Sequence, residues 1–154
     1  MDKWQHLFTH GEYAPPETIL SGLTLEQVTQ VPSNETHSIY DELWHLVRWQ
    51  RIIVFRDETL YEAWCSGEAY PPIPPSSNQE WQALVDTFFE GLEEALAWTR
   101  SPEKLGHETD PGITMADNLT SLAVHNAYHF GKIVTLRQVM GVWSPKLVKA
   151  EASG

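Results

Sequence analysis

The residues best suited to chemistry in this sequence are its seven histidines. His125 and His129 are four positions apart in a segment with helical periodicity. On a helix, such residues share one face with their Cβ atoms about 6 Å apart, so both imidazoles can reach a single metal ion. His129 lies within the apolar stripe of this segment and His125 at its edge. The pair therefore indicates either a metal site or two hydrogen-bonded core histidines, and the spacing alone leaves both open.

His45 is the candidate for a third ligand. It shares a helix face with Trp49 but flanks the main apolar stripe of its segment, so the periodicity permits it to face the core without requiring it. Asp41 and Glu42, one turn earlier, are alternative oxygen ligands or partners for a histidine N–H. Three imidazoles suit most late first-row divalent ions, so the residue types do not choose the metal.

The other histidines are expected to be solvated: His6, His10, His37 and His107. Asn126 stands between His125 and His129 where a zincin protease has its catalytic Glu, which excludes that class. The sequence contains no Gly-x-Ser-x-Gly motif. Its single cysteine, Cys65, excludes a disulfide framework and a thiolate metal site.

Helices are the elements expected to position these residues. Thr24 begins a capping-box pattern for a short helix that must stop before Pro32. Ser38 begins a second one, and because neither Gly nor Pro follows before about Trp64, we expect one long helix there. The Pro-rich stretch 70–77 must be a loop.

Two more helices are expected in the second half of the chain. Asn78 can cap an amphipathic helix that ends at Ser101-Pro102, and a loop is expected from there through residue 112. Thr114 caps the last helix, which Gly141 terminates. Together with a shorter first helix, these elements predict an all-α fold, a four-helix bundle with long crossover connections. We expect one domain over residues 1–154, with 142–154 as a C-terminal tail.

Composition narrows the function classes. The chain has 154 residues, 42% of them hydrophobic, and a formal net charge of −11. This charge repels phosphate backbones, so nucleic acid is a poor partner. The apolar runs are too short for a membrane span, and the N-terminus lacks the apolar region of a secretory signal. We therefore expect a cytoplasmic protein.

Two stretches resemble the DinB/YfiT-like family of proposed metal-dependent enzymes. Family members carry Ser-Ile-x-x-x-(apolar)-x-His on the second helix, matched here by residues 38–45, and His-x-x-x-His followed by Gly and an aliphatic residue on the last helix, matched by residues 125–133. The order of the two elements, and the gap of about 80 residues between them, also match. This sequence departs from the family pattern in its first helix, which is short and is preceded by a segment broken by prolines. One wall of the pocket is therefore expected to differ from that of relatives.

The resemblance implies a four-helix bundle, commonly a homodimer, with one divalent metal held by His45, His125 and His129. The metal varies within the family, which leaves nickel, zinc, manganese and iron as candidates. Some relatives are transferases or isomerases that use a low-molecular-weight bacterial thiol as co-substrate, and others are labelled hydrolases. Asn126 and Tyr128 would then lie near the site, beside Asp41 and Glu42, as residues that orient ligands.

Two functions follow. The first is a metal-dependent enzyme that acts on a small-molecule substrate, either by thiol transfer or isomerisation or by hydrolysis. The second is a non-catalytic metal-binding or stress-associated protein, a dimeric helical bundle. An enzyme should leave the metal an exchangeable position, whereas a structural site should be closed and four-coordinate.

Overall fold

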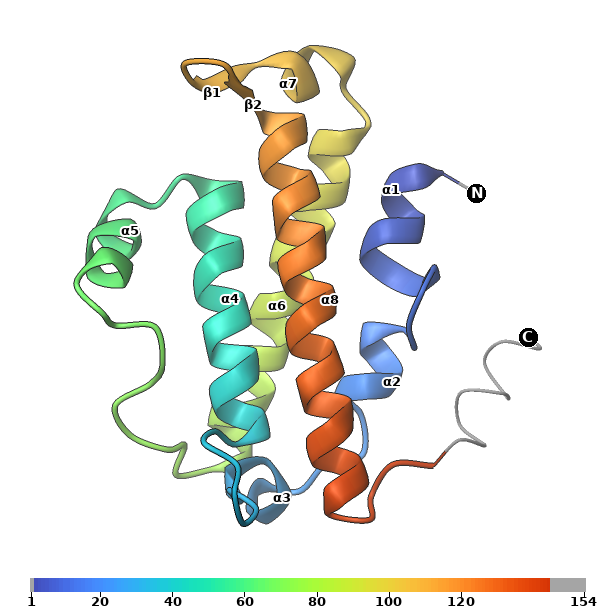
Figure 1. Cartoon of the computed structure of the whole chain (residues 1–154), viewed down its shortest axis with the longest axis vertical. Coiled ribbons are helices and arrows are strands. Elements are labelled where there is room, and N and C mark those ends of the chain that lie inside the picture. Colours follow the sequence, from blue (N-terminus) through green and yellow to red (C-terminus); the bar gives the residue numbers. More distant parts are fainter. Residues whose placement is uncertain (1, 145–154) are drawn as a thin grey trace.

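The computed structural model of the chain describes residues 2–144, so residues 145–154 of the expected tail lie outside the described part. Three long helices form the centre of the molecule, with α4 in contact with both α6 and α8 (Figure 1). Their bounds are Ile39–Phe55 for α4, Asn78–Thr99 for α6 and Met115–Val139 for α8. The expected all-α fold is confirmed, and within residues 2–144 every helix is too short or too polar to serve as a membrane span.

The fourth position of the bundle is held by an interrupted segment and not by one helix. The π-helical turn η1 and helix α2 contact α8, while helix α1 contacts α6 (Figure 1). Their bounds are Lys3–Gln5, His6–His10 and Pro16–Leu20, and the short helix α3 follows at Leu25–Thr29. Pro15 and Pro16 interrupt the segment because proline removes a backbone donor and cannot continue a helix from the preceding turn. Trp4 and Phe8 anchor the segment, with 7% and 1% of their surface exposed.

The starts of three helices are fixed by local chemistry. Thr24, Ser38 and Thr114 each accept a hydrogen bond from the backbone N–H three residues on, and the side chain at that third position accepts from the cap's own N–H. Such reciprocal capping boxes satisfy backbone donors that a helix start leaves free. The sequence-based expectation for these three starts is confirmed. Helix α6 is the exception, because its cap is Ser77 and not the expected Asn78.

The expected single helix from Ser38 to about Trp64 is wrong. Helix α4 ends at Phe55, Arg56 adopts a left-handed backbone conformation with φ of 53°, and a new helix, α5, spans Glu58–Cys65. The Asp57 carboxylate caps α5 by accepting from the Leu60 N–H at 3.0 Å. Asp57 is thus the N-cap of a new helix directly after Arg56. A break of this kind cannot be found by looking for Gly and Pro alone.

The expected loop before the last helix also contains regular structure. Helix α7 spans Pro102–Gly106, and strands β1 (Glu108–Asp110) and β2 (Ile113–Thr114) pair antiparallel with Glu108 opposite Thr114. Gly112, with φ of 78°, closes the turn between them. This hairpin and α7 cap the end of the bundle at which α8 begins (Figure 1).

Two buried polar side chains tie the helices together. Gln50 on α4 is fully buried and donates from Nε2 to the Phe88 carbonyl of α6 at 3.1 Å. Gly91 lies opposite, where a Cβ would overlap the Gln50 amide. Arg137 on α8 is 3% exposed and donates to carbonyls at the end of α2, including that of Ile19 at 2.7 Å. Arg137 therefore joins the interrupted N-terminal segment to the long helices.

Candidate metal centre

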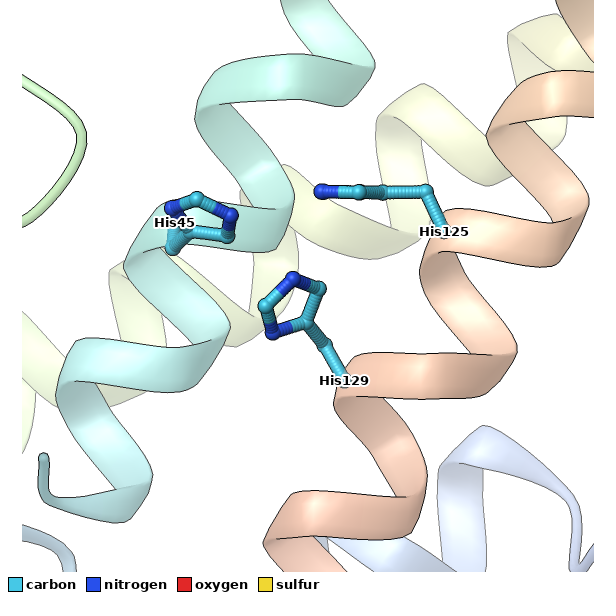
Figure 2. A group of neighbouring side chains, drawn as sticks. All are labelled: His45, His125 and His129. Carbon is cyan, nitrogen blue, oxygen red and sulfur yellow. The ribbon is translucent and has the colours of Figure 1, made fainter.

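Three histidines from two helices converge on one point. Figure 2 shows His45 on α4 facing His125 and His129 on α8. One ring nitrogen from each lies within 4.8 Å of the other two, a spacing at which three imidazoles could hold one metal ion. The ring centroids of His45 and His129 are 4.3 Å apart, and those of His125 and His129 are 4.5 Å apart. The structure thus brings together the three residues expected from the sequence, and metal binding by them stays a prediction.

The cluster lies at the contact between α4 and α8. His45 and His129 are buried, with 8% and 4% of their surface exposed, while His125 is partly buried. The i, i+4 spacing places His125 and His129 one turn apart on α8, as the periodicity predicts. His45, which the periodicity placed at the edge of an apolar stripe, faces the interior of the bundle in the structure.

His129 is oriented by a buried carboxylate. Its Nδ1 lies 2.6 Å from Glu42 Oε2, and both side chains are about 95% buried. An ionised carboxylate only accepts, so Nδ1 is the donor of this pair. The neutral form of the ring, which is the form that binds a metal, then has its lone pair on Nε2. Lys132 Nζ lies 4.0 Å from the other carboxylate oxygen of Glu42. A carboxylate behind a ligating histidine fixes the tautomer and raises the basicity of the ring.

His45 is oriented by the chain that connects α5 to α6. Its Nδ1 donates to the Ala69 carbonyl at 2.8 Å, which again leaves the Nε2 lone pair available. The Tyr70 ring stacks on His45 at a centroid distance of 4.5 Å and an angle of 15°. The Trp64 ring of α5 lies 4.7 Å from His45 at 40°.

His125 has no such partner for its Nδ1, which is buried and makes no hydrogen bond within residues 2–144. Burial, together with the smaller effects of the neighbouring His129 and His45, lowers the pKa of His125 to about 4. Burial also lowers the pKa of His45, although its hydrogen bond to Ala69 opposes this effect. Both rings are therefore neutral at physiological pH. Neutral imidazoles are the form that binds a metal cation, so the donor set fits a divalent ion.

The other candidate residues occupy different positions around this cluster. Glu42 contacts His129, whereas Asp41 serves in the capping box of Ser38 and contacts none of the three histidines. Asn126 is 1% exposed, and its Oδ1 has no hydrogen-bond partner in the described part of the chain. Tyr128 is 62% exposed, with its ring edge-on to His129 at 5.1 Å.

The histidines expected to be solvated differ among themselves. His10 and His107 are exposed, and His6 is partly exposed beside Glu12, 2.9 Å away. His37 is half-buried instead, because its ring stacks on Tyr70 at a centroid distance of 3.6 Å. Tyr70 therefore lies between His37 and the candidate ligand His45.

Three groups that contact His45 were not predicted from the sequence: Trp64, the Ala69 carbonyl and Tyr70. A backbone carbonyl has no signature in the sequence. In the sequence, Trp64 marked only the expected end of a long helix, and Tyr70 only the start of the Pro-rich loop. A contact made across a loop of this length leaves no periodic signal.

A cleft of about 570 Å³ adjoins the cluster. It includes Glu42 and Tyr70, which contact His129 and His45 respectively, and its wall continues along α8 through Tyr128, Lys132 and Thr135. Its volume lies within the range usual for small-molecule pockets. The cleft thus begins at the residues that orient the histidines.

Fold and site together define a helical-bundle protein with a three-histidine candidate metal centre. The model of the family described as DinB superfamily matches residues 17–133, more than half of the chain. The chain belongs to the DinB superfamily. Comparisons with curated proteins and with solved structures gave no match.

Proposed function

We propose that this protein is a metal-dependent enzyme that acts on a small molecule, with one divalent ion held by His45, His125 and His129. The observation that carries the proposal is the convergence of three ring nitrogens within 4.8 Å. In the described residues no fourth His, Cys, Asp or Glu joins this group. Three protein donors are typical of catalytic sites, which keep one position for water or substrate, whereas structural sites have four.

Three neutral imidazoles would leave a bound divalent ion its full charge, which acidifies a coordinated water or thiol and polarises a substrate oxygen. Glu42 holds the proton on Nδ1 of His129, and the Ala69 carbonyl holds the one on His45. Both rings therefore present Nε2 to the same point without rearrangement. Nickel, zinc, manganese and iron are all compatible with this donor set.

The nucleophile of the reaction is better supplied by a co-substrate thiol or by water than by a protein side chain. The one cysteine of the sequence, Cys65, is exposed on α5 and does not belong to the histidine cluster. We therefore propose thiol-dependent transfer or isomerisation, or hydrolysis, as the reaction class. The cleft beside Glu42 and Tyr70 would hold the substrate.

Metal analysis of protein purified without a histidine tag tests the site. We expect about one equivalent of metal per chain in the wild type and none in a His125→Ala/His129→Ala variant that stays helical by circular dichroism. A His10→Ala/His107→Ala variant, which removes two exposed histidines, should keep its metal. Metal retained by the first variant would refute the site.

Cobalt substitution separates an enzyme from a closed binding protein. Adding a small thiol or azide to the Co²⁺ form should change its visible absorption if a coordination position is open to ligands. An unchanged spectrum would contradict catalysis at this centre and would favour the non-catalytic metal-binding alternative.

A further inference from the structure

The crossover between α4 and α6 has a weak attachment to the rest of the molecule. This crossover strap, as we define it, comprises residues 57–77, that is, α5 and the Pro-rich loop. Helix α5 contains no buried residue. The helix lies between two left-handed backbone positions, Arg56 with φ of 53° and Gly67 with φ of 98°. An element with little buried surface belongs to the low-stability part of a structure.

Two aromatic rings and one backbone carbonyl of the strap contact the same side chain of the bundle, His45. Trp64 lies against His45, Tyr70 stacks on its ring, and the Ala69 carbonyl accepts its Nδ1 proton. Trp64 also approaches Trp49 of α4, with ring centroids 5.1 Å apart. Within residues 2–144, the strap forms one ion pair with the bundle, Glu68 with Arg48 at 3.3 Å. The Glu68 side chain is exposed, and surface pairs of this kind contribute little.

We propose that Trp64 and Tyr70 are positioning residues for His45, and that docking of the strap and binding of the metal are coupled. The inference rests on the proposed metal site. The strap holds the His45 ring at one angle and in one tautomer, which prepares Nε2 as a ligand. A metal bound to His45 would in turn fix the ring against which the strap docks. Coupling between two binding events is necessarily reciprocal, so each stabilises the other by the same amount.

Tyr70 also has an anchor of its own. Its other stacking partner, His37, precedes the first residue of α4 and lies parallel to Tyr70 within 7°. Tyr70 is thus held between the start of α4 and His45. The stacked ring of Tyr70 makes these contacts, and its hydroxyl does not. The variant Tyr70→Phe should therefore keep the wild-type affinity for the metal.

Two variants and one control measure the coupling. The affinity for Zn²⁺ is measured by competition with a chromophoric chelator, and the melting temperature is measured in EDTA. We expect Trp64→Ala/Tyr70→Ala to bind Zn²⁺ at least tenfold more weakly, the lower end of the range for residues that orient ligands. Its metal-free melting temperature should stay near that of the wild type, because α5 buries no residue. Tyr70→Phe and the control Ile73→Ala, whose side chain is 74% exposed in the same loop, should bind as the wild type does.

Hydrogen exchange measures the effect in the reverse direction, that of metal binding on the docking of the strap. Adding Zn²⁺ should slow exchange of the α5 amides in the wild type and not in the double variant. If the double variant binds Zn²⁺ as tightly as the wild type, or if Zn²⁺ leaves α5 exchange unchanged, the coupling is refuted while the metal site stands. If the wild type binds no Zn²⁺, Ni²⁺, Mn²⁺ or Fe²⁺, the proposed function fails and the coupling fails with it.

Discussion

Glu42 offers the sharpest test of how the bundle prepares its candidate metal centre. Glu42 is 3% exposed, and its Oε2 lies 2.6 Å from His129 Nδ1. In Glu42→Gln, the amide oxygen can still accept the proton from Nδ1, but the charge is lost. We expect metal affinity to fall 10- to 100-fold, the usual effect of removing a carboxylate behind a ligating histidine. This corresponds to about 1.4–2.7 kcal/mol of binding free energy.

Stability should respond differently from affinity. The variant keeps the shape of the side chain and removes a buried charge, so the metal-free protein should unfold at about the wild-type denaturant concentration. Glu42→Ala should be less stable than Glu42→Gln, because it leaves a cavity and an unpaired N–H on His129.

Asp41→Asn is the matched control, since it removes one negative charge at the next position of the same helix. Asp41 belongs to the capping box of Ser38 and does not contact the histidine cluster. Its replacement should lower stability slightly and leave affinity unchanged. Titration calorimetry with Zn²⁺ gives the affinities, and urea unfolding in EDTA gives the stabilities. Equal affinity in Glu42→Gln and wild type, or an equal loss in Asp41→Asn, would refute the reasoning.

Three further perturbations test the fold and the histidines. Arg137→Met should lower the free energy of unfolding by about 1–3 kcal/mol, measured in urea, because buried carbonyls at the end of α2 lose their donor. Gly91→Ala should destabilise by about 1–3 kcal/mol, as overpacking does, and Gln50→Ala in the same chain should relieve the overlap in a double-mutant cycle. The folded-state pKa of His125, about 4, lies below the ordinary 6.5, so the unfolded state binds more protons between these values. Stability in EDTA should therefore fall as the pH drops from 6.5 towards 4, and His125→Phe should show a shallower fall.

The sequence predicted the part of the site that lies on α8 better than the part on α4. A spacing of four on one helix determines a shared face, so His125 and His129 could be paired from the sequence alone. His45 could not be assigned this way, because a residue at the edge of a stripe turns inward only if a neighbour covers it. The groups that cover it, Trp64 and Tyr70, belong to a crossover that periodicity does not describe.

The adjacent carboxylates show a second limit of sequence reasoning. Asp41 and Glu42 were equivalent candidates, yet Asp41 caps its helix and Glu42 reaches His129 on another helix. The choice depends on the rotation of α4 about its axis relative to α8, which is a tertiary quantity. The helix break at Arg56 is a third limit. Arginine is not a residue type that favours the left-handed conformation, so its identity does not predict the break.

The capping boxes of α4 and α8 have a consequence for how this centre tolerates insertions and deletions. Ser38 and Thr114 fix where each helix starts, so the angular phase of every later side chain is counted from them. One residue inserted between Ser38 and His45 would rotate His45 by about 100° about the helix axis, out of the cluster. Seven inserted residues would restore its phase to within about 20° and displace it along the axis by two turns. The lengths of the segments from cap to histidine are therefore a sequence constraint of the centre in their own right, separate from the identity of any residue within them.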